Sequence, residues 1–449
     1  MSTGYLSTTP DDRARMLDAI GAASVDELFA DVPDGLRLRA PLALPPALSE
    51  PELFDHLAEL AGANVGQDGE LSFLGFGMYD HYVPAIVDAI TSRGEFLTAY
   101  TPYQPEISQG TLQAIFEFQT AICELTGLDV SNASMYDGAT AAVEAVVMAA
   151  GQTGRKRVLL PDAVHPEVHA VLATYAPGLG LELVAVPLRD GRTDPAEVEG
   201  ALTADVACVV LQHPNALGLL EDAPRIGAAC RGAGALLVAS VDPTSLGVLA
   251  PPGAYGAALA VGEGQAFGNG ASYGGPTFGF LACSEDLLRR LPGRLVGETQ
   301  DVEGRRGYVL AFQTREQHIR REKATSNICT NHALNALAGI VHMSWIGKRG
   351  IVELGHLLLQ RARYARDRLA RVPGVEVAFD APHFKEVVMR LPEPADACQA
   401  ALATEGINPG HPLGHHFPGL EDCIQVAVTE RRSRADIDRL VAALEARYA

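Results

Sequence analysis

An aspartate that follows an apolar strand is the first candidate for chemistry in this chain. The stretch Leu236–Val241 is apolar almost throughout, and Asp242 comes directly after it. Open α/β sheets bind ligands at the carboxyl ends of their strands, so this carboxylate could face a ligand and pair with a positive charge there. An aspartate before a proline is as often the cap of a loop, and the local sequence favours neither interpretation.

Two further segments could complete such a site. Met135–Thr140 opens an alanine-rich helix, whose exposed N–H groups at Gly138 and Ala139 could hold a phosphate. Asp137 would repel an anion, and we expect this residue simply to cap the helix. His165 could stack on a flat ring, although a lone histidine is more often structural.

Enzymes that use pyridoxal phosphate need such a carboxylate, a helix N-terminus, a stacking ring and a lysine that holds the cofactor as a Schiff base. The lysine should follow the strand after the Asp242 strand, within Val261–Pro276, which contains no lysine. Lys323 lies in the charged run Arg320–Lys323, typical of a solvated surface. The other three lysines are Lys156, in a basic turn, and Lys348 and Lys385, in the C-terminal domain. The sequence therefore predicts a cofactor-enzyme fold without the residue that anchors the cofactor.

Metal and disulfide chemistry are not expected. His411, His415 and His416 cluster in a loop that is rich in proline and glycine, and no acidic pair lies nearby in the sequence. The seven cysteines are widely spaced and include no CxxC pair. This pattern favours a chain without disulfides or structural zinc, in a reducing cytoplasm.

A polar segment stiffened by prolines, Thr98–Gly110, precedes another helix. Its side chains suit a small polar ligand, although its tyrosines could equally pack at a subunit interface. The candidate residues are Tyr100, Thr101, Tyr103, Gln104 and Glu106.

The elements that must position these residues indicate an α/β fold. Short apolar runs alternate with segments long enough for helices, which predicts a mainly parallel sheet covered on both faces. The expected strands are Arg157–Leu160, Leu181–Pro187, Val206–Leu211, Leu236–Val241, Ala258–Val261 and Thr277–Ala282.

Three domains are expected. Residues 1–70 predict a helical arm whose first helix is capped by Thr9. Residues 71–330 predict the large α/β domain. Residues 331–449 predict a smaller α+β domain with helices at 331–345 and 350–370 and a last helix capped by Ser433. In the arm, the positions expected to be buried are Met16, Ile20, Leu28 and Phe29.

The net charge is −20, which argues against nucleic acid or an anionic membrane as a partner because both need a basic surface. No uncharged apolar run reaches the roughly 20 residues of a membrane span. The first 15 residues also lack the order of a secretory signal.

Several segments resemble, in order, the P-protein family of the glycine cleavage system, and most closely the first subunit of its two-subunit bacterial form. The resemblance covers essentially the whole chain. Its markers are Thr9–Arg13, Met16–Leu17, Ile20–Gly21, Asp26–Phe29, Met78–Pro84, Tyr100–Gly110, Asn132–Thr140, Gln212–Asn215 and Glu322–Thr330.

The resemblance implies the aminotransferase-like fold of pyridoxal-phosphate-dependent transferases, fold type I. It implies that a second subunit binds the cofactor covalently, with two copies of each subunit forming a heterotetramer. Gln265 would then stand near the place of the missing lysine, and Asp242 and His165 would be remnants of a cofactor site. No residue of this chain is assigned a catalytic role with certainty.

The implied reaction is the decarboxylation of glycine and transfer of its aminomethyl group to the lipoyl group of the small H-protein. By analogy with related dimers, whose active sites lie at subunit interfaces, residues 100–106 would contribute to the substrate pocket. Two alternatives remain open. The chain could be a self-sufficient pyridoxal enzyme that uses Lys323, or a non-catalytic structural or regulatory scaffold.

Overall fold

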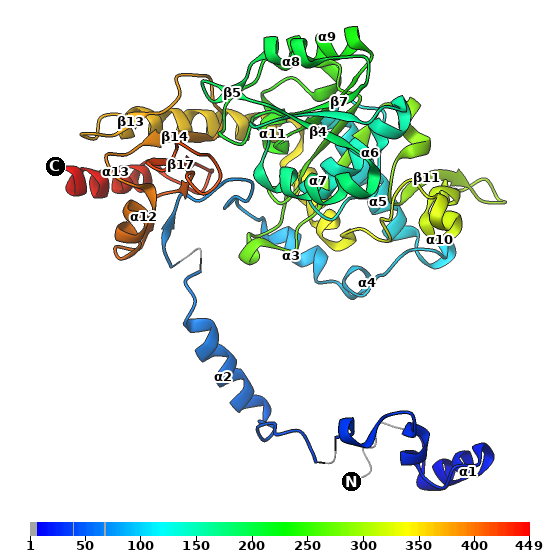
Figure 1. Cartoon of the computed structure of the whole chain (residues 1–449). Coiled ribbons are helices and arrows are strands. Elements are labelled where there is room, and N and C mark those ends of the chain that lie inside the picture. The colour runs from blue at the N-terminus through cyan, green and yellow to red at the C-terminus, as the bar shows by residue number, and fades with distance from the viewer. Residues whose placement is uncertain (1–6, 39, 67–68) are drawn as a thin grey trace. The chain divides into compact units, whose positions relative to one another are not determined.

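The computed structural model describes residues 7–38, 40–66 and 69–449. The chain separates into two compact units, which divide between Val65 and Gly66 (Figure 1). The first unit holds two helices and two short 3-10 helices, and the second holds every strand of the described residues.

The helices of the first unit begin where the sequence signals predict. Helix α1 (Pro10–Ile20) starts after Thr9, whose hydroxyl accepts a hydrogen bond from the Asp12 N–H while the Asp12 carboxylate accepts one from the Thr9 N–H. Helix α2 (Glu50–Gly62) starts after Ser49 with the same reciprocal arrangement. Each pair satisfies N–H groups that a helix leaves without an internal partner.

The prediction that apolar residues of this unit are buried is wrong for the unit by itself. Met16 and Ile20 in α1 are 53% and 61% exposed, and Leu28 and Phe29 in η1 (Val25–Phe29) are 53% and 51% exposed. Two helices and short turns such as η2 (Asp34–Leu36) offer too few surfaces to enclose a core.

A seven-stranded sheet forms the centre of the second unit and confirms the predicted α/β class. β10 runs antiparallel to both of its neighbours, and the remaining pairs are parallel. All six predicted strands are present. In order across the sheet, the strands are β2 (Val130–Ser131), β10 (Gly279–Cys283), β9 (Leu259–Glu263), β8 (Leu236–Ser240), β7 (Val206–Gln212), β3 (Arg157–Pro161) and β4 (Glu182–Val186).

Two apolar cores cover the two faces of this sheet, because successive strand side chains point to opposite sides. In β3, Val158 and Leu160 belong to one core and Leu159 to the other. The first core is closed by α6 (Gly138–Thr153) and α7 (Pro166–Leu179). The second is closed by α5 (Gln109–Thr126), α8 (Pro195–Ala201), α9 (Ala223–Ala233) and α11 (Ala333–Leu369). The sheet is therefore the middle of three layers.

One hairpin was not predicted. β11 (Leu295–Gln300) pairs antiparallel with β12 (Arg306–Ala311), and Tyr308 and Leu310 of β12 pack in a small core with Leu112 of α5. The strands carry polar residues such as Glu298 and Gln300, which hide the strand pattern in the sequence.

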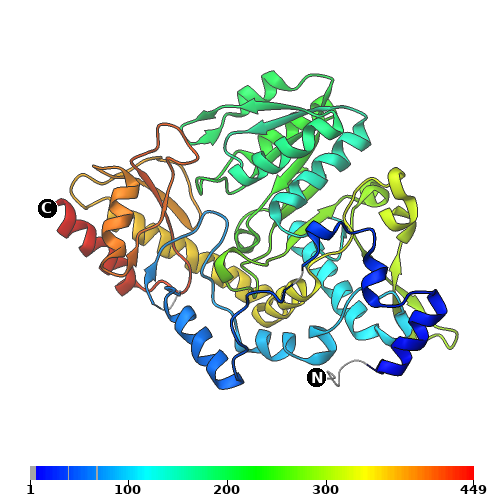
Figure 2. The same cartoon turned by 60° about the horizontal axis from the view of Figure 1, so that its bottom comes forward.

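The C-terminal part forms a second, antiparallel sheet, drawn in orange and red beside the first (Figures 1 and 2). Its strands, in order, are β13 (Glu376–Val377), β14 (Glu386–Arg390), β17 (Cys423–Ala427) and β16 (His411–Pro412), with α12 (Ala395–Ala403) and α13 (Arg434–Tyr448) beside them. The Ser433 side chain caps α13, as predicted. Strand β1 (Leu71–Ser72) pairs with β15 (Ile407–Asn408), so the chain that leads into the large sheet first passes through the C-terminal part.

Helix α11 joins the two parts. Gly347 interrupts it with φ 62° and ψ 174°, a conformation that favours glycine. The two predicted helices are therefore present, and the break at Gly347 falls between their predicted ranges, 331–345 and 350–370. No helix among the described residues is long and apolar enough to cross a membrane.

The close approach of α9 to the loop before β9 generates a prediction. A Cβ built on Gly227 would lie 2.0 Å from the carbonyl oxygen of Tyr255, whereas one on Gly232 of the same helix meets nothing within 4 Å. We expect Gly227→Ala to lower the free energy of unfolding by about 2 kcal/mol, because a backbone carbonyl must move. The control Gly232→Ala should leave it unchanged or slightly raised. Urea unfolding of both variants measures the difference, and equal values would contradict the prediction.

Candidate functional site

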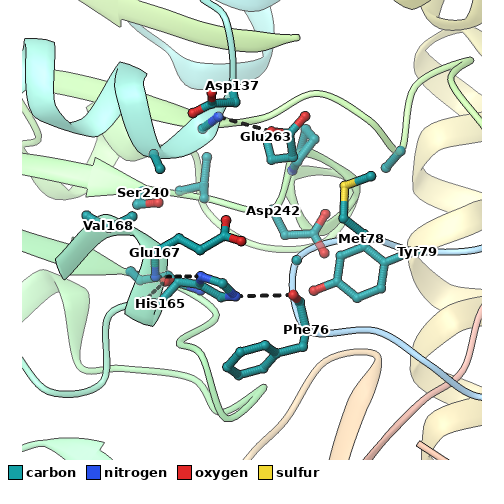
Figure 3. Close-up of a pocket in the computed structure, with 17 residues that line it drawn as sticks. Phe76, Met78, Tyr79, Asp137, His165, Glu167, Val168, Ser240, Asp242 and Glu263 are labelled. Carbon is teal, nitrogen blue, oxygen red and sulfur yellow. Dashed lines mark hydrogen bonds between the residues drawn. The ribbon is translucent and has the colours of Figure 1, made fainter. Parts of the chain in front are cut away.

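A cavity of about 140 Å³ lies at the carboxyl ends of β8 and β9, where helices α6 and α7 also begin. Asp137 and Glu263 border one side of it, and His165 and Phe76 border the other (Figure 3). The segment that carries Phe76 enters from β1 and crosses the carboxyl edge of the sheet. This is the place where an open α/β sheet binds a ligand.

Asp242 caps the short helix η4 (Pro243–Gly247), which is one of the two interpretations that the sequence left open. It also borders the cavity. Its Oδ1 accepts hydrogen bonds from the N–H and hydroxyl of Thr244 at 2.9 and 2.7 Å. Its Oδ2 lies 2.6 Å from Nζ of Lys385. Burial acts to raise the pKa of Asp242, but the Lys385 ammonium and the Thr244 hydroxyl outweigh it and hold the pKa below its ordinary value.

The N-terminus of α6 is occupied by protein carboxylates. Asp137 caps the helix, as expected, by accepting a hydrogen bond from the Thr140 N–H at 2.7 Å. Glu263, at the end of β9, accepts one from the Gly138 N–H at 3.0 Å. Its other oxygen accepts one from the Gln265 N–H at 3.1 Å. Burial raises the pKa of Glu263 to about 7, although these N–H donors oppose the rise.

Gln265 is 1% exposed and is fully engaged with the backbone. Its Oε1 accepts a hydrogen bond from the Tyr79 N–H at 3.0 Å. Its Nε2 donates to the carbonyls of Tyr79 at 3.0 Å and Asn269 at 2.7 Å. The side chain therefore ties the segment that crosses the cavity to the loop after β9.

His165 borders the cavity but has protein partners. Its Nδ1 accepts a hydrogen bond from the Glu167 N–H at 3.3 Å, and its Nε2 lies 3.2 Å from the carbonyl oxygen of Phe76. Its ring lies 4.4 Å from the Phe76 ring, tilted by 45°. Burial lowers the pKa of His165 to about 4, so the ring is neutral at pH 7.

The histidine-rich loop contributes rings to the same edge. His411 stacks on Phe76 at 4.4 Å, and His416 stacks on His411 at 5.6 Å. His415 instead contacts Asp396 at 3.0 Å. Among the described residues, no group of three or more histidine, cysteine or acidic side chains is arranged to hold a metal ion.

The loop that carries Tyr100, Thr101, Tyr103, Gln104 and Glu106 does not line this cavity. Tyr100 is 80% exposed and Tyr103 is half exposed. Arg294, which is buried, donates from Nη2 to the Thr101 hydroxyl at 3.1 Å and to the Tyr103 hydroxyl at 3.2 Å. Arg294 also pairs with the buried Glu316 at 2.6 Å. Two side chains of this loop are therefore anchored, while Gln104 and Glu106 remain exposed.

Three residues of these arrangements were not predicted. Lys385 was assigned to the C-terminal domain, away from the cofactor site, yet it contacts Asp242. Glu263 and Arg294 each meet residues more than 120 positions away in the chain. The run Lys385–Glu386 before an apolar strand looks like an ordinary surface turn, so no local signal marks it.

The family model of the glycine cleavage system P-protein matches residues 3–444. The chain belongs to this family. A probable glycine dehydrogenase (decarboxylating) subunit 1 from Anoxybacillus flavithermus is 50% identical over 437 residues, which cover 97% of each chain. One from Brevibacillus brevis is 49% identical over 447 residues, which cover 99% of each.

Solved structures agree. A crystal structure of glycine decarboxylase (P-protein) of the glycine cleavage system, in inhibitor-bound form, matches with a TM-score of 0.89 and 46% identity over 98% of this chain and 99% of that one. A NifS-like protein from Rickettsia africae matches with a TM-score of 0.64 at 14% identity, covering 84% of this chain and 99% of that one. Together with the P-protein structure, this likeness confirms the predicted fold type I of the pyridoxal-phosphate-dependent enzymes.

The residues at the cavity do not fit that cofactor. A Schiff base needs a lysine on the loop after β9, where Gln265 holds the backbone of Tyr79. A phosphate needs free N–H groups at a helix N-terminus, where Asp137 and Glu263 already accept hydrogen bonds. A ring nitrogen needs an unpaired carboxylate, and Asp242 is paired. Each position has a protein partner instead.

The buried Glu263 generates a prediction about pH. Its pKa is raised from an ordinary 4.5 to about 7, so the folded state holds a proton more tightly than the unfolded state. That contribution to stability is fully present below pH 4.5 and is lost as pH rises through 7. Glu263→Gln removes it, so the free energy of unfolding of the variant should rise relative to the parent by about 3 kcal/mol between pH 4 and pH 8.

Urea unfolding at several pH values tests this expectation. Glu167→Gln, at an exposed carboxylate beside the same cavity, is the matched control and should run parallel to the parent chain. A pH-independent difference for Glu263→Gln would show that its carboxyl group does not titrate differently on folding.

Proposed function

We propose that this chain is the subunit without the cofactor lysine in a two-subunit glycine decarboxylase of the glycine cleavage system. One observation carries the proposal: the loop after β9 presents Gln265 in place of a lysine, and this amide is already bonded to Tyr79 and Asn269. A pyridoxal enzyme of this fold must then take its lysine from another chain. The names of the relatives, which are called subunit 1, support the same division.

The proposed reaction releases the carboxyl carbon of glycine as CO2 and transfers the aminomethyl group to lipoylated H-protein. The S–S bond of the lipoyl group breaks, one sulfur binds the aminomethyl carbon, and the other sulfur takes a proton. Pyridoxal phosphate, when bound by the partner subunit, supplies stabilisation of the carbanion that remains after CO2 departs. The assembly is proposed to be a heterotetramer with two copies of each subunit, and its place in the cell the cytoplasm.

The contribution of this chain to the reaction is proposed to come from its Tyr100–Glu106 loop. Much of the loop is exposed. Arg294 donates hydrogen bonds to the hydroxyls of Thr101 and Tyr103, and its guanidinium carbon lies 5.2 Å from the centre of the Tyr103 ring, over its face. Two anchored side chains beside exposed polar ones suit the positioning of a small substrate at an interface. Gln104 and Glu106 are the side chains free to reach it.

The first expected outcome concerns the assembled enzyme. Exchange of labelled CO2 into glycine should require this chain, its partner subunit and pyridoxal phosphate together, because the proposal places the lysine in the partner and the loop in this chain. The chain alone should show no exchange. Exchange by this chain alone would contradict the proposal, and borohydride trapping with peptide mapping would then test Lys323, which is exposed.

The second concerns the loop. We expect Gln104→Ala and Tyr103→Phe to lower glycine turnover of the assembled enzyme by ~10-fold or more, since small displacements of positioning groups are costly. Tyr175→Phe in α7, which removes another partly exposed hydroxyl, is the control and should be neutral. Unchanged turnover in both loop variants, with normal assembly by gel filtration, would mean that this chain is a scaffold that contributes no group to the pocket.

A further inference from the structure

Lys385 is the one buried lysine of the four in this chain, all of which lie in the described residues. It is 1% exposed, whereas Lys156, Lys323 and Lys348 are exposed. A buried ammonium is costly unless its charge and its hydrogen-bond donors are satisfied. Lys385 therefore needs partners within the protein.

Every donor of this ammonium has a partner. Nζ lies 2.6 Å from Asp242 Oδ2, 3.0 Å from His81 Nε2 and 3.3 Å from Thr244 Oγ1. It also lies 3.5 Å from the centre of the Tyr79 ring, over its face. An aromatic face attracts a cation, so the fourth side of the ammonium is favourable as well.

The partners come from three separate parts of the fold. Asp242 and Thr244 follow β8 of the large sheet, and Lys385 directly precedes β14 of the C-terminal sheet. His81 lies in the segment that crosses between them, and its Nδ1 contacts Glu430, which follows β17, at 2.8 Å. A single ion pair therefore joins the two sheets and the crossing segment.

The ion pair lies at the carboxyl end of β8. In a pyridoxal enzyme of this fold, the carboxylate at this strand end meets the positive ring nitrogen of the cofactor. Here the same carboxylate meets Lys385, while Glu263 takes the helix N-terminus that would hold a phosphate. Lys385 does not itself line the cavity, so its nitrogen is not offered to a ligand.

We infer that Lys385 replaces the cofactor as the positive charge that Asp242 requires, and that this ion pair clamps the C-terminal domain onto the carboxyl edge of the large sheet without any ligand. The clamp makes the fold of this chain independent of pyridoxal phosphate. It also makes cofactor binding and the native ion pair mutually exclusive.

A double-mutant cycle on the full chain tests the clamp. Lys385→Met and Asp242→Asn each leave one buried charge or polar group without its partner, and each should lower Tm by roughly 5 °C or more. The double variant should recover a large part of that loss, because no unpaired charge remains. Lys348→Met is the matched control and should not change Tm.

Hydrogen exchange gives a second readout that general destabilisation would not produce. In Lys385→Met, amides of η4 and β14 should lose protection before those of β3 and β7 of the large sheet. Single variants with parental Tm, or a double variant no more stable than either single one, would overturn the inference. Uniform loss of protection across the chain in Lys385→Met would overturn the inference that the ion pair holds the C-terminal domain on the large sheet.

Pyridoxal phosphate itself provides the last arm. The parent chain, incubated with it and reduced with borohydride, should retain no stoichiometric label. Labelling at Lys385 would overturn the inference, because the ion pair could not then be the resting state. This arm uses the isolated chain and needs no partner subunit, so its outcome is independent of glycine turnover in the assembled enzyme.

Discussion

The carboxylate of Asp242 lies at the carboxyl edge of the sheet with 14% of its side chain exposed, and a charge so largely removed from water needs a partner of opposite sign. Lys385 supplies that partner from the C-terminal sheet, and the ordering of the crossing segment follows from it. The ring of Tyr79 lies against the Lys385 ammonium, and its hydroxyl lies 3.0 Å from the Glu386 carboxylate. The backbone N–H of Tyr79 donates a hydrogen bond to the Gln265 side chain. His81 adds a link to Glu430. The cavity has its shape because these contacts hold the segment above it.

The same constraint explains why acidic groups in this region differ in their protonation. Burial raises the pKa of Glu263 and of Glu386 to about 7, although hydrogen bonds from N–H or hydroxyl groups oppose the rise. No ion pair of either carboxylate is found among the described residues. Asp242 and Glu430 are also largely removed from water, with side chains 14% and 18% exposed, yet contacts with Lys385 and His81 keep their pKa values low. A specific partner thus decides the outcome more than depth does.

A cavity whose candidate cofactor positions all have protein partners limits what the chain can contribute. Gln265, Glu263 and Lys385 hold the protein together where a cofactor enzyme would hold its cofactor. The fold itself remains a rigid base for exposed loops. Arg294 shows how such a base is used, since its buried guanidinium anchors the hydroxyls of Thr101 and Tyr103 while Gln104 and Glu106 stay exposed.

The sequence by itself determined the large sheet, its strands and the absence of a lysine after β9, because apolar runs, helix caps such as Thr9, Asp137 and Ser433, and residue identities are local signals. It left open whether Asp242 faces a ligand or caps a loop. It could not reveal that Lys385 meets Asp242, 143 positions earlier in the numbering, or that Glu263 meets the first turn of α6. Those contacts are decided only when separate strands are packed side by side, because burial and pairing of a charge depend on neighbours that no local pattern encodes.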